Sequence, residues 1–170
     1  ATDYGFDDNL WHNYLTFFLM MSENPFSMTC EKVGASDGSV NELVENDFRI
    51  FKELFDYDFG PIEKDLGINC FSQISNYKAI HKKDLMYNKN VSEKVRSLSK
   101  KLEAAKDEKE FFDAVTGFYK DYGVGMFGLN KAFRIDDTPQ GSFTFRAINN
   151  MDTVMLDDLV GYEIQKKKLV

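Results

Sequence analysis

The stretch with the clearest chemical potential is GVGMFG, from Gly123 to Gly128. Its spacing matches GxGxxG, the pattern with which dinucleotide-binding folds cradle a phosphate. That chemistry needs a strand before the glycines and a helix after them, so that backbone amides and the helix dipole meet at the phosphate. Here a helical pattern comes before Gly123, and we expect a strand after Gly128. Because this order is reversed, we interpret Gly123 as a helix cap and not as part of a nucleotide site.

The remaining reactive residues form no catalytic or metal-binding set. We interpret His12 and His81 as structural or surface residues, because neither has a partner at metal-ligand spacing. Cys30 and Cys70 are too few and too far apart for a disulfide framework or a zinc site, so we expect a reducing compartment and two small buried hydrophobes. Three acidic pairs lie where caps and turns favour Asp: Asp7–Asp8, Asp136–Asp137 and Asp157–Asp158. Without a P-loop pattern or a nucleophile elbow, the sequence predicts no metal site and no enzymatic activity for this stretch of chain.

The elements that would position these residues are predicted mostly as helices. Asp7 and Asp8 can cap a helix whose apolar face includes Leu10, Trp11, Tyr14, Leu15 and Phe18, and the Asn24–Pro25 step ends it. The residues from 24 to 38 then read as a loop. Pro61 suits a short helix ending near Gly67, and residues 68 to 90 form an irregular or short-helical connection.

Three further helices are predicted from capping signals. Ser39 with Glu42 forms an S-x-x-E capping box, Ser92 opens the next helix, and Asp107 with Glu110 repeats the capping-box logic. The last two helices are joined so tightly that they should form an antiparallel or steeply crossed hairpin. The apolar periodicity predicts that eight residues are buried: Val40, Leu43, Phe48, Phe51, Leu98, Phe111, Phe118 and Phe133.

Two alternating stretches near the end predict a β-hairpin. KAFRI (131–135) and SFTFRAI (142–148) flank the turn sequence DDTPQG. We expect Phe133 and Ile135, with Phe143, Phe145 and Ala147 opposite, to face the helices, because an isolated ribbon is marginal in water. The predicted fold is therefore mainly α, a helical bundle with one β-hairpin near the C-terminus, or α+β overall.

Length, composition and charge are typical of one folded domain. The chain has 170 residues, of which 43% are hydrophobic and sixteen are Phe. Its net charge is −7, yet residues 78–106 carry nine bases against three acids. This basic segment could bind nucleic acid, but the solvated face of a helix is the simpler interpretation.

No apolar run is long enough to cross a membrane. The longest, LTFFLMM from Leu15 to Met21, falls well short of the ~18 residues that a span requires. No basic-then-apolar leader precedes it. We therefore expect a cytoplasmic protein with no membrane partner.

The C-terminal stretch MLDDLVGYEIQKKKLV, from Met155 to Val170, predicts a turn followed by a helix with no stop signal. An unfinished helix leaves its last carbonyls without partners. We therefore expect the chain to be a fragment of a longer protein. The segment after Asp158 should be poorly ordered in it, or should pack in a way that the intact protein could not use.

Three segments, taken in order, resemble a known family. ENPFSMTCE (23–31), YGVGMFGLNKAFRI (122–135) and LDDLVGYEIQKKKL (156–169) are similar to the N-terminal region of a bacterial family of AAA-type P-loop ATPases of unknown function, the DUF 815 family. The resemblance implies that Leu159, Val160, Gly161 and Tyr162 contact adenine in the full-length protein. It also implies that ATP and Mg²⁺ bind to a module beyond residue 170.

The resemblance divides the chain in two. Residues 1–148 would be a helical accessory domain with a hairpin, and residues 149–170 a linker with the first turn and helix of a truncated ATPase module. The expected function is non-catalytic: a regulatory, partner-recognition or assembly domain that binds no ATP by itself. Its expected partners are the downstream ATPase module and another protein or a second copy. Nucleic-acid binding through residues 78–106 is the alternative.

Overall fold

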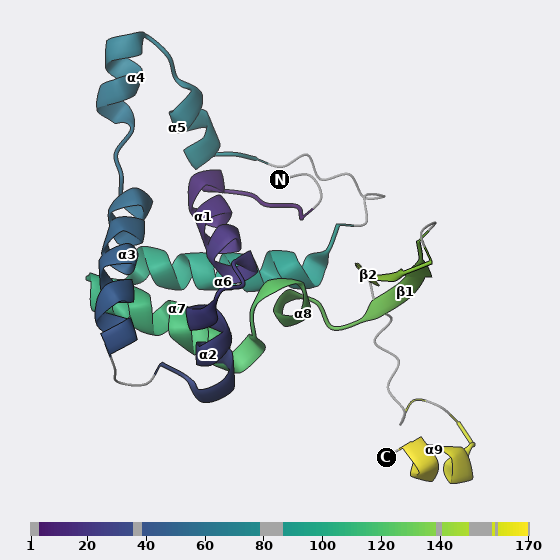
Figure 1. The fold of residues 1–170 in the computed structure, drawn as a ribbon. Helices are drawn as coiled ribbons and strands as arrows, with labels where there is room; N and C mark the ends of the chain where they lie inside the picture. Colours follow the sequence, from purple (N-terminus) through teal and green to yellow (C-terminus); the bar gives the residue numbers. More distant parts are fainter. Residues whose placement is uncertain are drawn as a thin grey trace.

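The computed structural model describes residues 4–35, 39–78, 87–138, 141–149, 158 and 160–169. These residues form nine helices and one antiparallel hairpin, which confirms the mainly α fold (Figure 1). The helices are α1 (Leu10–Met21), α2 (Pro25–Val33), α3 (Ser39–Phe55), α4 (Gly60–Leu66), α5 (Cys70–Ser75), α6 (Lys89–Ala104), α7 (Glu108–Tyr122), α8 (Gly125–Leu129) and α9 (Glu163–Leu169). The strands are β1 (Phe133–Asp137) and β2 (Phe143–Ala147).

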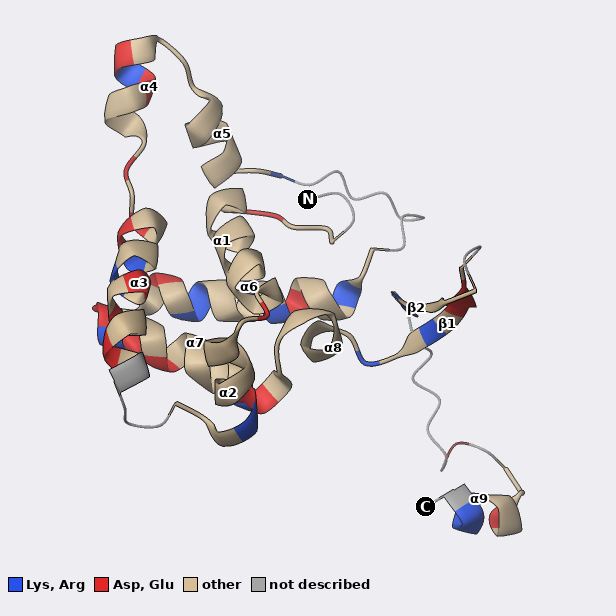
Figure 2. Cartoon of the chain, in the orientation of Figure 1, with Lys and Arg blue, Asp and Glu red and all other residues tan. Residues whose placement is uncertain are grey.

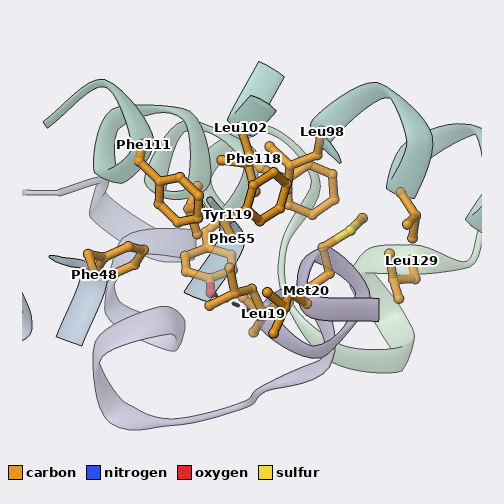
Figure 3. Packing of buried hydrophobic residues seen from close by; sticks show 14 of the residues in the cluster. Leu19, Met20, Phe48, Phe55, Leu98, Leu102, Phe111, Phe118, Tyr119 and Leu129 are labelled. Carbon is orange, nitrogen blue, oxygen red and sulfur yellow. Dashed lines mark hydrogen bonds between the residues drawn. The ribbon is translucent and has the colours of Figure 1, made fainter. Parts of the chain in front are cut away.

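A core of aromatic and aliphatic side chains lies among α1, α2, α3, α6 and α7, which we call the helical body (Figure 3). Phe111 of α7 is fully buried, with its ring centroid 5.6 Å from that of Phe55 and 6.4 Å from that of Phe48. Tyr119, also buried, donates a hydrogen bond of 2.9 Å from its hydroxyl to the carbonyl of Leu19. Burial raises the pKa of the Tyr119 hydroxyl, so it remains a donor.

Four of the eight predicted core residues are confirmed as buried: Phe48, Leu98, Phe111 and Phe118. Phe51 and Phe133 are only partly buried, and the side chain of Val40 lies outside the described residues. The prediction for Leu43 was wrong, because this residue is 75% exposed. Helix α3 packs through one narrow stripe, Val44, Phe48, Phe51 and Phe55, and Leu43 lies one residue off it.

The first helix is rotated relative to our prediction. Its buried residues are Asn13, Leu15, Thr16, Leu19 and Met20, whereas Tyr14 and Phe18 are exposed. Nearly all of α1 is apolar, so periodicity alone could not select the face that packs on the core. The helix is also capped by Asn9, whose side-chain oxygen accepts from the amide of His12 at 3.0 Å, and not by Asp7 or Asp8.

The loop predicted for residues 24–38 was wrong, because residues 25–33 form α2. Asn24 accepts from the Ser27 amide at 2.9 Å, and the Ser27 hydroxyl accepts from the Asn24 amide at 3.0 Å. This is a reciprocal capping box with Pro25 in the first turn of the helix. The Asn-Pro step therefore opens a new helix three residues after α1 ends.

Capping predictions differ in outcome between α6 and α7. Helix α7 begins as predicted, with the Asp107 carboxylate accepting from the Glu110 amide at 2.8 Å. Helix α6 begins earlier than predicted, because Asn88 and not Ser92 is its cap. The two helices pack side by side, in agreement with the predicted helical hairpin (Figure 1). The Ser39 capping box lies outside the described side chains.

The fourth and fifth helices form an arm that projects from the body (Figure 1). Gly67, with φ of +64°, ends α4 in the left-handed region, which confirms the predicted short helix. The Glu63 carboxylate accepts from the Ser72 hydroxyl and, at 2.8 Å, from the Ser72 amide. These hydrogen bonds, the hydroxyl first, lower the pKa of Glu63 and tie α4 to the start of α5.

The hairpin follows α8 and pairs Phe133 with Ala147 and Ile135 with Phe145. Asparagines anchor its base: the Asn88 amide donates to the side-chain oxygens of Asn130 and Asn149. Contrary to prediction, the apolar face of the hairpin does not turn to the helical body. Among the described residues outside the hairpin, only Phe127 of α8 makes ring contacts with it, 4.9 Å from Phe133 between centroids.

Candidate functional site

The C-terminal stretch leaves its apolar side chains uncovered. Val160 is 96% exposed, and Tyr162 and Ile164 are also largely exposed. Gly161 and Tyr162 both have positive φ, +87° and +62°, so the backbone turns sharply before α9 begins. Leu159 lies outside the described residues. The described members of the predicted adenine-contact set are therefore exposed together on one turn. Helix α9 forms where a helix was predicted.

The glycine-rich stretch serves a tight turn between α7 and α8. Gly123 and Gly125 have φ of +83° and +67°, values that side chains disfavour. A Cβ on Gly128 would lie 2.4 Å from the carbonyl carbon of Gly123, so only glycine fits there. The strand predicted after these glycines is confirmed, since β1 begins at Phe133, but the short helix α8 at residues 125–129 was not predicted.

Two carboxylates lie against this turn from the α1–α2 side. The Glu31 carboxylate accepts from the Val124 amide at 3.2 Å. A Cβ on Gly125 would lie 1.8 Å from a carboxylate oxygen of Glu23, so that side chain packs directly on the glycine. A phosphate at this turn would meet two negative charges and an amide already engaged. The geometry supports a structural role for the glycines.

The basic segment does not present a uniform positive face. Residues 79–86, which include His81, lie outside the described part of the chain. Lys94 turns inward, where its ammonium donates to the Gly128 carbonyl at 2.7 Å and lies 4.9 Å from the centroid of the Tyr122 ring. Burial, and secondarily Lys131, lowers the pKa of Lys94. Lys89 pairs with Glu93 at 3.8 Å.

Acidic residues are interspersed with basic ones along α6 and α7 (Figure 2). A groove of about 410 Å³ between α6 and α7 is lined by bases and acids in equal number: Lys94, Lys101, Lys131, Glu93, Asp113 and Asp121. A nucleic-acid backbone would meet repulsion as well as attraction in this groove.

An aromatic hollow near the N-terminus was not predicted. It encloses about 400 Å³ and is lined mainly by Tyr4, Phe6, Leu10, Trp11, Tyr14 and Phe17. A hollow of this size and lining can take a small apolar group. The signal in the sequence was the excess of aromatic residues around α1, more than one helix face can bury.

The ring donors of α1 satisfy carbonyls at the end of α3. Trp11 Nε1 donates to the Leu54 carbonyl and His12 Nε2 to the Phe55 carbonyl, both at 2.8 Å. The His12 ring also stacks on Phe55 at 3.9 Å, and its buried Nδ1 has no hydrogen-bond partner among the described residues. Burial lowers the pKa of His12. His12 is therefore a structural residue, as predicted, although only one of its nitrogens is bonded.

The two cysteines differ. Cys30 is buried, as predicted, and burial raises the pKa of its thiol. Cys70 was predicted to be buried and is exposed at the start of α5. Within the described ranges no three His, Cys, Asp or Glu side chains gather as metal ligands would. No helix in the same ranges has the length and apolar character needed to cross a membrane.

No protein-family model, curated protein or solved structure matches the chain.

Proposed function

We propose that the chain is the non-catalytic N-terminal domain of an AAA-type ATPase, with a regulatory, partner-recognition or assembly role. In this proposal residues 1–148 form the accessory domain, and residues 149–170 link it to an ATPase module that follows. The observation that carries it is the 96% exposure of Val160 next to an exposed Tyr162, in the segment that resembles the adenine-contacting stretch of such ATPases. Two apolar side chains held in water on one turn support a role in contacting something outside the described residues.

The chemistry of the turn suits an adenine ring. Gly161, at φ of +87°, lets the backbone approach a flat ring closely. Its two neighbours in the chain, Val160 and Tyr162, offer apolar surface for the same ring. Leu159 is assigned the same role by the resemblance alone. In the ATPase the phosphates and Mg²⁺ require the amides and Lys of a P-loop, which this sequence does not contain. The chain would thus supply base contacts only.

Nucleotide binding tests the proposal in two steps. Calorimetry with the 170-residue chain should show no ATP binding in the micromolar range. In the longer protein, Val160→Asp should weaken ATP binding by about tenfold or more, because a carboxylate would replace an apolar contact with the base. Val33→Asp is the matched control, since Val33 is also exposed but lies on α2. Equal ATP affinity in the two variants would contradict the adenine-contact role.

Nucleic-acid binding through residues 78–106 is the weaker alternative. The engagement of Lys94 and Lys89 within the chain counts against it. An anisotropy titration with single- and double-stranded oligonucleotides at two salt concentrations tests it. Affinity that falls steeply with salt would favour this alternative, because it reports phosphate contacts.

A further inference from the structure

The outward face of the hairpin is apolar and exposed. Its register places Phe133, Ile135, Phe143 and Phe145 on one face. Ile135 is 62% exposed, Phe143 65% and Phe145 38%, although strands in a stable sheet normally cover one face. Phe127 of α8, 57% exposed, continues this surface, since its ring centroid lies 5.4 Å from that of Phe145. We call these five residues the hairpin face.

The opposite face of the hairpin is polar and carries Arg134, Asp136, Thr144 and Arg146. Arg146 pairs with Asp136 there, with Nε 2.8 Å from the carboxylate. Covering the hairpin face would therefore leave this ion pair in water and would bury no charge at the centre. Asp137 lies on the same face as the apolar residues, directly across from Phe143, but at the far end of the strand, where it would be at the rim.

From these observations we infer that the hairpin face is a dimer interface, which packs against the same face of a second copy of the chain. This inference concerns residues outside the adenine-contact stretch and does not depend on the ATPase parentage. Two-fold symmetric interfaces require a surface that is complementary to itself. The apolar face of a two-stranded sheet meets this requirement, because two such faces can pack at about 10 Å with their side chains interdigitated.

The exposed area agrees with the size that a dimer needs. With about 200 Å² for each whole side chain, the hairpin face exposes roughly 450 Å² of apolar surface. A standard interface buries about 800 Å² on each partner, of which somewhat more than half is non-polar, again about 450 Å².

Charge also favours contact at this region. The chain carries a net charge of −7, so two copies repel each other over most of their surface. Residues 131–149 are close to neutral, with three bases and two acids, whereas residues 78–106 carry nine bases against three acids and would repel the same segment of a second copy. Two copies therefore approach with the least electrostatic cost at the hairpin.

Sedimentation equilibrium with the 170-residue chain tests the inference. We expect a monomer–dimer equilibrium with a dissociation constant on the order of micromolar. Phe143→Ser should raise that constant by about tenfold or more, because it removes the most exposed aromatic side chain of the hairpin face. Leu43→Ser is the matched control on α3 and should leave the constant unchanged. Equal far-ultraviolet circular dichroism of the two variants checks that both fold.

A cross-linking variant locates the contact. Ile135 lies near the middle of the hairpin face, so two copies of Ile135→Cys should approach each other across the two-fold axis. In a Cys70→Ser background, mild oxidation should give a covalent dimer, and the addition of Phe143→Ser should suppress it.

Several results would overturn the inference. One is a chain that stays monomeric up to about 100 µM, which would leave the hairpin face for a different partner. Another is a dimer that Leu43→Ser or Val160→Asp disrupts as much as Phe143→Ser does, because the interface would then lie on α3 or at the C-terminal turn. A dimer without an Ile135→Cys cross-link would also exclude the packing described.

Discussion

The helical body and the hairpin use the same residue type in opposite ways. Phe111 is surrounded by other rings and has no exposed surface, whereas Phe143 is 65% exposed. Burying a large aromatic side chain stabilises the fold by roughly 2–3 kcal/mol, so the phenylalanines of α3 and α7 account for much of the stability of the body. Those of the hairpin contribute little to it. The comparison indicates that the body folds without the hairpin's apolar surface, which is then free to contact a partner.

Truncation of one ring in each region should give the largest contrast. Phe111→Ala should lower the free energy of unfolding by about 3–5 kcal/mol, because it leaves a cavity in a close-packed core. Phe143→Ala should lower it by less than about 1 kcal/mol. Urea denaturation of both variants at a concentration where the chain is monomeric measures the two effects. Similar losses would mean that the hairpin belongs to the core.

The glycines give a second contrast, between a closed turn and an open helix face. Gly128→Ala should destabilise the protein by about 1–3 kcal/mol, since the added methyl would meet the backbone of Gly123. Gly117, in the middle of α7, has open space beside it, so Gly117→Ala should stabilise by up to about 1 kcal/mol. Thermal unfolding of the two variants should therefore shift in opposite directions. A neutral Gly128→Ala would contradict the close approach.

A single hydroxyl tests how tightly α1 is held to α7. Tyr119→Phe should cost about 1 kcal/mol, because the Leu19 carbonyl loses a buried donor. The cost is limited, since the Ser22 amide also donates to this carbonyl, at 3.3 Å. Tyr122→Phe, on the exposed end of the same helix, is the control and should change the denaturation midpoint little. Equal losses of stability in the two variants would contradict the conclusion that the buried hydrogen bond of Tyr119 stabilises the fold.

The smallest effect should appear as a pH dependence of the body. Burial lowers the pKa of His12 from its ordinary value of 6.5, although Glu103 and Asp56 act to raise it and Lys52 adds a lowering effect. The folded state therefore binds fewer protons than the unfolded state, and stability is lost as the pH falls from about 6.5 through the lowered value. His12→Gln can keep the hydrogen bond to the Phe55 carbonyl and should flatten this part of the curve. An unchanged slope in that variant would assign the titration to another group.

Local signals in the sequence predicted most of the elements but not how they pack. Asp107 caps α7 as expected because capping depends on residues a few positions apart. The Asn24–Pro25 step has two meanings, an end for one helix and a start for the next, and only Ser27 shows which applies. The exposure of Leu43 could not be predicted, because the apolar periodicity of α3 does not show which side of the helix other elements cover. That depends on the tertiary packing.

The same limit applies to the candidate sites. Alternation in the sequence predicts an apolar face on the hairpin, but not that this face is left largely exposed away from the helical body. The structural role of the glycine turn rests on Glu23 and Glu31, about a hundred residues earlier in the chain, and no motif links them to it. The adenine-contact prediction for residues 159–162 rests on resemblance and awaits the nucleotide experiments.

Hydrogen exchange of the 170-residue chain at low and high protein concentration tests the central comparison most directly. We predict that amides of α6 and α7 exchange only through global unfolding, whereas those of β1 and β2 open locally at much lower free energy. Raising the concentration should slow the exchange of the hairpin amides most, because a second copy covers their face. Hairpin amides as protected as those of α7 at every concentration, or unchanged by concentration, would contradict the account.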